Sequence, residues 1–209
     1  MADEVLKRDE NYIPVAGGLT NDANLEIKAL RVDPTSKRLL TNDSGTTKSS
    51  YGTHTALTIT NLNSLASSQT AGWQSIRISN LTNLAVDYEI AIKLTMADTA
   101  PANDKAVYVY ISPAYYDGSA WYQSDGGTAT LPSGEEGTYT IALPNNLKLL
   151  GSLNYTTQKM VLQGVFYLTN TIGNTLPDGF SIIIVNYSGA AIAATGNMVA
   201  YKPINYKNE

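Results

Sequence analysis

Few side chains in this chain of 209 residues are suited to covalent or metal chemistry. It contains no cysteine and a single histidine, His54. The lack of cysteine excludes disulfides, thiolate catalysis and iron–sulfur ligation, and one histidine cannot form a histidine-based zinc site. A Ser–His–Asp triad needs only one histidine, but no G-x-S-x-G motif accompanies it. We therefore expect His54 to be a surface or interface residue, and we expect no enzymatic activity, no metal and no cofactor.

Carboxylates are the next candidates for chemistry. Glu135 and Glu136 are the only adjacent acidic pair after residue 50. Neighbouring side chains of an extended chain point in opposite directions, so these two would not converge on a glycosidic bond, and we expect solvated turn residues. Three Asp-Gly pairs lack the spacing of a calcium loop, and Gly17-Gly18 lacks the strand–helix context of a phosphate loop. We expect Gly17-Gly18 to be a bend and the Asp-Gly pairs, which begin at Asp117, Asp125 and Asp178, to be turns.

Aromatic side chains are the strongest binding candidates. Tyrosine and tryptophan combine a large apolar area with a polar group, which suits both protein interfaces and sugar stacking. The plainer interpretation places half of the aromatic cluster in the core and the rest on a surface or subunit interface; a carbohydrate platform is the alternative. The cluster comprises Tyr108, Tyr110, Tyr115, Tyr116, Trp121 and Tyr122, of which Tyr115, Tyr116, Trp121 and Tyr122 are the candidate surface or interface residues.

The elements that must position these residues are β-strands. Apolar and polar residues alternate over residues 86–96, and residues 107–111 (VYVYI) and 181–187 (SIIIVNY) are rich in strand formers. Turn signals separate further short candidates. This pattern predicts an all-β antiparallel jelly-roll or β-sandwich of about 8–10 strands. The other expected strands lie near residues 57–59, 73–78, 121–122, 139–141, 147–153, 161–168 and 198–204.

Charge divides the chain near Ser50. Residues 1–50 carry 15 of the 32 charged side chains, seven basic and eight acidic. We therefore predict two parts: residues 1–50, an extended N-terminal arm with a polar linker, and residues 51–209, the β-domain. The whole chain has a net charge of -4, which argues against direct nucleic-acid binding. No apolar run reaches the roughly 20 residues that span a bilayer, and the first residues lack the pattern of a signal peptide, so we expect no membrane association.

The predicted arm has only short apolar clusters, which must pack on something else. Asp33-Pro34 is typical of a turn that would fold residues 30–32 against residues 38–40 as a small hairpin. We expect the apolar residues of the arm to be assembly contacts. They are Tyr12, Ile13, Val15, Leu25, Ile27, Leu30, Val32, Leu39 and Leu40.

The segment from Arg8 to Leu40 (RDENYIPVAGGLTNDANLEIKALRVDPTSKRLL) resembles a leader of many tailed-bacteriophage virion proteins. The leader has the pattern R-D-x-N-x-x-P-V-x-x-G-V-T-x-D, followed by L-R-V-D-P-x-x-x-R-L-L; here Leu19 replaces a valine. The body is also similar to phage structural proteins, over residues 105–132, 144–155 and 177–204. The resemblance implies a virion location, with assembly in the host cytoplasm.

Within that family, the resemblance implies a capsid cement or decoration protein. Such a protein would be a homotrimer whose arms staple neighbouring major capsid proteins and stabilise the head. One alternative is a tail, neck, baseplate or fibre component that attaches through the same arm. Another is a carbohydrate- or receptor-binding β-sandwich module that uses the aromatic cluster.

Overall fold

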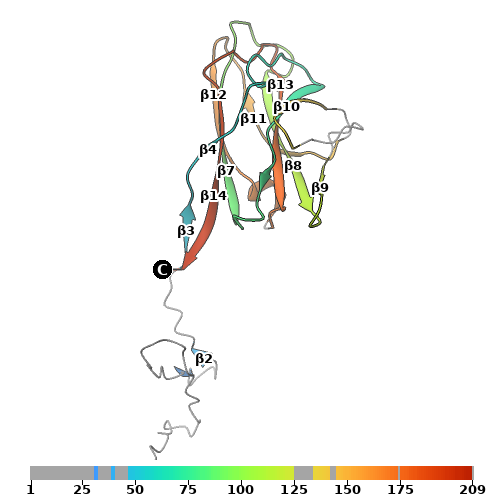
Figure 1. Cartoon of the computed structure of the whole chain (residues 1–209). Helices are drawn as coiled ribbons and strands as arrows, with labels where there is room; N and C mark the ends of the chain where they lie inside the picture. The colour runs from blue at the N-terminus through green and yellow to red at the C-terminus, as the bar shows by residue number, and fades with distance from the viewer. Residues whose placement is uncertain are drawn as a thin grey trace, which may run out of the picture. The chain divides into compact units, whose positions relative to one another are not determined.

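The computed structural model describes residues 31–32, 39–40, 47–124, 134–141, 145–173 and 175–208. Residues 31–32, 39–40, 47, 207 and 208 are described by their backbone alone. The chain divides into two compact units. One comprises Met1–Thr46 with Asn208–Glu209, and the other, called the body below, is Thr47–Lys207 (Figure 1).

The first unit contains the predicted hairpin. Strand β1 (Arg31–Val32) pairs antiparallel with β2 (Leu39–Leu40), so that Arg31 lies opposite Leu40 and Val32 opposite Leu39. A turn signal between two short apolar segments was therefore sufficient to predict this pairing.

The body consists of two sheets, called sheet I and sheet II. Sheet I has the strand order β12-β7-β14-β3, with β4 also paired to β14. Its strands are β3 (Thr47–Tyr51), β4 (Thr55–Ala56), β7 (Asp87–Thr95), β12 (Val161–Tyr167) and β14 (Met198–Asn208).

Sheet II has the order β10-β5-β13-β8-β11. In addition, β6 pairs with β13, and β9 pairs with β8. Its strands are β5 (Ala71–Gln74), β6 (Ile78–Ser79), β8 (Ala106–Tyr116), β9 (Trp121–Gln123), β10 (Gly137–Thr140), β11 (Lys148–Asn154) and β13 (Gly179–Tyr187). A four-residue helix, α1 (Thr169–Ile172), follows β12.

The connections make the body a jelly roll. When β4, β5, β7, β8, β11, β12, β13 and β14 are numbered 1 to 8 in chain order, sheet I reads 1-8-3-6 and sheet II reads 2-7-4-5. The chain thus passes repeatedly from one sheet to the other, which is the double Greek-key arrangement of a jelly roll. The predicted all-β fold class is confirmed. Among the described residues of the body there are twelve strands: nine of the expected ones and the short β3, β4 and β6. The strand expected at residues 57–59 was wrong, because β4 ends at Ala56.

The main core lies between the two sheets. On β7 the even-numbered residues from Tyr88 to Leu94 are buried, and on β8 the buried residues include Val107, Val109 and Ile111. The ring of Tyr88 meets that of Phe180 edge-on, with centroids 5.1 Å apart. This alternation follows from the two-residue period of a strand, which turns every second side chain inward.

At one edge of the sandwich, Gly151 of β11 packs closely against β12. A Cβ atom on Gly151 would lie 2.5 Å from Cε1 of Phe166 in β12, so no larger residue fits without displacing that ring. The register between β11 and β8 also shifts between Leu149 and Gly151, which is a bulge. Glycine at this position therefore lets the edges of the two sheets approach each other.

A second, smaller core covers the outer face of sheet II. It contains Tyr139, Ile141, Leu147, Ile183 and Val185. Because β10 and β11 are the opposite edges of sheet II, the chain that joins them must pass from one edge to the other. Ile141 and Leu147, which belong to that connection, pack against β13, so the outer face is partly covered.

The end of the polar linker that we expect within residues 1–50 is a strand in the structure. Its last four residues, 47–50, belong to β3, which pairs with β14. No helix among the described residues is long and apolar enough to cross a membrane.

Candidate functional site

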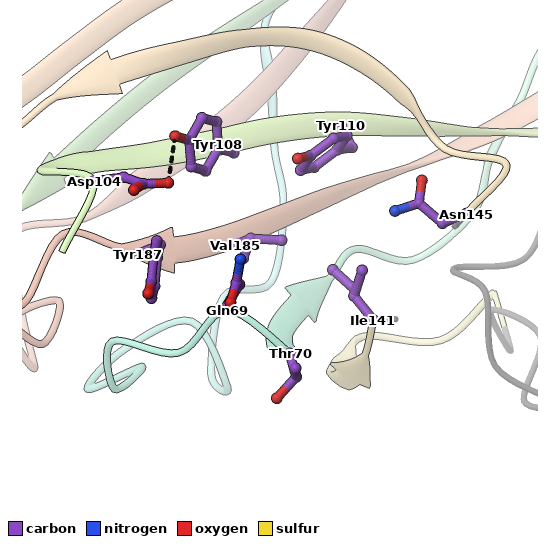
Figure 2. A pocket seen from close by; sticks show the side chains of 9 residues that line it. All are labelled: Gln69, Thr70, Asp104, Tyr108, Tyr110, Ile141, Asn145, Val185 and Tyr187. Carbon is purple, nitrogen blue, oxygen red and sulfur yellow. Dashed lines mark hydrogen bonds between the residues drawn. The ribbon is translucent and has the colours of Figure 1, made fainter. Parts of the chain in front are cut away.

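A groove with three tyrosines lies on the outer face of sheet II (Figure 2). Its volume is about 430 Å³, within the range of small-molecule sites. The described lining residues are Gln69, Thr70, Asp104, Tyr108, Tyr110, Ile141, Asn145, Val185 and Tyr187.

Strand alternation and register bring the aromatic residues of the groove together. Since Val107, Val109 and Ile111 face the main core, Tyr108 and Tyr110 must face outward. In the neighbouring strand β13, Val185 lies opposite Tyr108. Tyr187 is two residues beyond Val185 and therefore on the same face. Two strands about 75 residues apart in the sequence thus form one surface.

The rings of Tyr108 and Tyr110 lie along β8 with centroids 6.4 Å apart and planes inclined by 42°. Both side chains, and that of Tyr187, are half-buried. Ile141 and Val185 are buried beneath them. Figure 2 shows the side chains from β8 and β13 around a common space, with Asn145 at the end near Tyr110. The groove therefore offers tilted aromatic surfaces over an apolar base.

The carboxylate of Asp104 lies at one end of this aromatic surface. The Tyr108 hydroxyl donates a hydrogen bond to Oδ2 of Asp104 at 2.9 Å (Figure 2). This hydrogen bond, together with burial, raises the pKa of Tyr108, and burial raises the pKa of Tyr110. Both hydroxyls therefore stay protonated and able to donate hydrogen bonds at neutral pH.

Other polar groups of the groove are available to a ligand. Within the described residues, the hydroxyls of Tyr110 and Tyr187 have no hydrogen-bond partner. The Asn145 side chain uses its Oδ1 to accept the N–H of Leu147 at 3.1 Å, which leaves its amide N–H groups for another partner. The described lining contains one carboxylate and no lysine, arginine or histidine.

The four predicted surface aromatics lie at the other end of β8. In the β8–β9 pairing, Tyr115 is opposite Tyr122 and Tyr116 is opposite Trp121. Adjacent residues of a strand face opposite ways, so the two pairs lie on different faces. Tyr115 and Tyr122 are 61% and 57% exposed, whereas Tyr116 and Trp121 are half-buried. The expectation that half of the six-residue cluster lies in the core was wrong, because the inward positions of β8 are valine and isoleucine.

Trp121 is already engaged within the chain. Its ring lies 5.0 Å from that of Tyr116, and the Arg77 guanidinium sits 4.9 Å above it. A Cβ on Gly179 would also lie 2.9 Å from the indole. These contacts show that Trp121 packs against its own chain.

His54 belongs to a charged cluster on the outer face of sheet I. Its Nε2 lies 2.9 Å from Oε1 of Glu89, while the Lys202 ammonium lies 3.0 Å from Oε2. The Tyr167 hydroxyl donates to the same carboxylate at 3.3 Å. The His54 side chain is 48% exposed. It is thus a surface histidine that forms an ion pair when protonated.

The acidic pair also has a structural role that the sequence did not reveal. Glu136 is not a solvated turn residue: its Oε1 accepts the indole N–H of buried Trp73 at 2.6 Å and the backbone N–H of Asn61 at 2.8 Å. Its Oε2 accepts the Asn61 amide at 2.8 Å. The carboxylate therefore connects β5 to a preceding loop. That prediction was wrong because its partners lie more than 60 residues away.

The Asp-Gly predictions can be followed at two of three positions. Asp117 accepts the backbone N–H groups of Ser119 and Ala120, both at 2.8 Å, and Gly118 has a φ of 97°, as in a tight turn. Asp178 instead accepts the Tyr116 N–H at 2.9 Å. Asp125 and Gly17-Gly18 lie outside the described residues. No group of three or more acidic or histidine side chains able to hold a metal ion occurs in the described part of the chain.

The predicted assembly contacts are largely outside the described residues. Val32, Leu39 and Leu40 lie in the β1–β2 hairpin, but only their backbone is described. The others lie wholly outside: Tyr12, Ile13, Val15, Leu25, Ile27 and Leu30.

Among the groove residues that the sequence did not single out are Asp104, Asn145 and Tyr187. Asp104 and Asn145 lie between the expected strands, and Tyr187 is the last residue of the strand expected at residues 181–187. The alternation in residues 107–111 could have placed the two tyrosines on one face, but the partners depend on the β8–β13 register.

Comparisons with known proteins supply no family for this chain. No family model matches it, and no curated protein matches it.

Proposed function

We propose that this protein is a non-enzymatic structural component of a tailed-phage virion, and that it decorates the capsid. The observation that carries the proposal is the leader-like pattern from Arg8 to Leu40, which lies outside the jelly roll, in the unit of residues 1–46. Both parts of the pattern, the part that begins at Arg8 and the part that begins at Leu30, resemble leaders of virion proteins.

The organisation of the chain supports an attachment role for the first unit. The residues of the two described core clusters lie between Leu57 and Tyr201, so each is built from the body. The segment before Thr47 carries short apolar groups and 14 of the 32 charges, since only Lys48 of the first 50 residues' charges lies beyond it. Such a segment gains most by packing on another surface.

The mechanism follows from multivalency. One arm contributes a small apolar and strand-edge contact with the major capsid protein. A homotrimer would present three such arms, and binding of the first raises the effective concentration of the others. Copies bound where capsid subunits meet would then resist separation of those subunits.

Removal of the first unit tests the attachment mechanism. We expect residues 47–209 to unfold cooperatively on heating, like the full chain, but to lose binding to capsids that lack this protein. The truncation begins at Thr47 because β3 belongs to sheet I. Full binding by residues 47–209 would contradict attachment through the arm.

A finer test keeps the chain intact. Val32 and Leu39 face each other in the hairpin register, so Val32→Asp combined with Leu39→Asp introduces two charges at one place. We expect weaker capsid binding, whereas the matched change Val165→Asp on the exposed face of β12 leaves it unchanged. Equal losses from both changes would argue for attachment through the body.

The main alternative is a tail, neck, baseplate or fibre component held by the same arm. Electron microscopy of particles labelled with an antibody to the body distinguishes these locations. Decoration requires label over the head and hundreds of copies per particle, whereas a tail location requires label at one vertex. Unlabelled particles would contradict both assignments.

A further inference from the structure

We propose that the groove formed by Tyr108, Tyr110 and Tyr187 on sheet II binds a short, neutral oligosaccharide. This inference concerns the body and does not depend on the virion function. It rests on three properties of the groove: its aromatic surfaces, its polar groups and its charge.

The aromatic surfaces suit the apolar faces of sugar rings. Tyr108 and Tyr110 are half-buried and tilted by 42°, with centroids 6.4 Å apart, so they form neighbouring surfaces along one strand. Their rings are supported from below by buried Val185 and Ile141. Rigid tyrosines lose little conformational entropy on binding, which favours them as contact residues.

The polar groups suit hydroxyl groups on the ring edges. Oδ2 of Asp104 accepts from Tyr108, and its Oδ1 can accept from a ligand hydroxyl. Asn145 supplies amide donors, and Gln69 and Thr70 are exposed at the rim (Figure 2). A purely apolar ligand would leave this ring of donors and acceptors without partners, which costs binding energy.

The charge of the groove selects neutral ligands. Asp104 is the one charged side chain of the described lining, and the whole chain carries -4. A phosphorylated, sulfated or uronic-acid ligand would face a carboxylate with no cation in the described lining to balance it. A neutral saccharide meets no such repulsion.

The test uses the full chain on an array of neutral gluco-, manno-, galacto- and xylo-oligosaccharides, printed beside sialylated and uronic-acid glycans. We expect binding to a subset of the neutral probes. The affinity for the best arrayed oligosaccharide is then measured by calorimetry for the wild type and for variants. Tyr110→Ala should weaken binding by at least about tenfold, as expected for a central aromatic contact.

Two further variants keep the result interpretable if Tyr110→Ala affects folding. Asp104 is exposed, so Asp104→Asn should leave thermal unfolding unchanged while it weakens binding several-fold through loss of a charge-assisted hydrogen bond. Tyr122→Ala removes an exposed tyrosine of β9, which pairs with the far end of β8, and should leave the affinity within about twofold.

Three results would overturn the proposal. They are failure to bind any neutral glycan on the array, binding to acidic glycans alone, and an affinity unchanged by both Tyr110→Ala and Asp104→Asn. Loss through Tyr122→Ala instead would place the site on the Tyr115–Tyr122 pair. None of these results bears on attachment through residues 1–46, which the truncation tests separately.

Discussion

The outer faces of the two sheets differ, although both sheets share the main core. On sheet II, Ile183 and Val185 point away from that core but are 0% and 4% exposed. On sheet I, Val165 and Met198 point outward and are 58% and 41% exposed. The difference arises because Ile141 and Leu147, which follow β10 and precede β11, pack with Ile183 and Val185 in one buried cluster and cover part of the outer face of sheet II.

The uncovered face of sheet I is organised by charge instead. The register places Tyr167, Glu89 and Lys202 in one row across β12, β7 and β14. Glu89 is buried, and three side chains donate to its carboxylate. The comparison shows that strand composition alone does not determine the environment of an outward-facing side chain. Such a side chain is buried where a chain connection covers the sheet, and it is solvated or forms ion pairs where the sheet is uncovered.

The largest effect is expected for Ile183→Ala. Ile183 is fully buried on the outer face of sheet II, so truncation should lower the free energy of unfolding by about 3 kcal/mol through lost burial and a cavity. Chemical denaturation measures it. A loss below about 1 kcal/mol would mean that the covering segment does not exclude water.

Glu89→Ala tests the opposite face. The Lys202 side chain is only 16% exposed, and the change removes its partner. We expect a loss of about 2 kcal/mol in the free energy of unfolding, as for a hydrogen bond to a charged group that is partly withdrawn from water. Lys159→Ala, which breaks the exposed pair with Asp98, is the control and should change little.

The same valine-to-alanine substitution on each outer face compares how strongly the two faces are buried. Val185→Ala should cost about 1.5 kcal/mol, whereas Val165→Ala should stay within about 0.5 kcal/mol. Thermal unfolding under identical conditions measures both. Equal costs would remove the distinction between a covered face and an open one.

Lowering the pH should reduce the contribution of the Glu89 cluster on sheet I to the free energy of unfolding. This effect should be smaller than those of the substitutions above. Burial raises the pKa of Glu89, but hydrogen bonds from Lys202, His54 and Tyr167 outweigh it and hold the pKa below 4.5. A carboxylate with a lowered folded-state pKa stabilises the fold above the unfolded-state value, and this contribution is lost as the pH falls through the folded-state pKa. The stability difference between wild type and Glu89→Gln should therefore shrink as the pH falls below 4.5. A difference that does not change with pH would contradict the assignment.

The sequence was sufficient for the longer strands but not for the short β3, β4 and β6, nor for the environment of any strand. Residues 181–187 (SIIIVNY) are apolar on both faces, and this predicts a buried strand without indicating what covers it. In residues 107–111 valine and tyrosine alternate, and since both are apolar the pattern does not say which faces the core. The hairpin at Asp33-Pro34 was predictable because its signal is local.

The candidate site was predictable only in part. Two of its tyrosines stood out in the sequence, but Asp104, Asn145 and Tyr187 come from a turn, a crossing connection and another strand. The β8–β13 pairing, in which Val185 lies opposite Tyr108, brings Tyr187 to the groove. Asn145 instead comes from the segment before β11, which pairs with the other side of β8. Glu136 shows the same limit, because its hydrogen bond to Trp73 joins residues 63 apart in the chain.

The sequence by itself determined the all-β class, the positions of the longer strands, the local hairpin and the uneven distribution of charge, because these follow from neighbouring residues and a two-residue period. The tertiary structure decided which outward faces are covered, which tyrosines line a groove and which carboxylates are paired. Those properties depend on strand order and register, which bring distant residues together, and a local pattern contains no information about its distant partner.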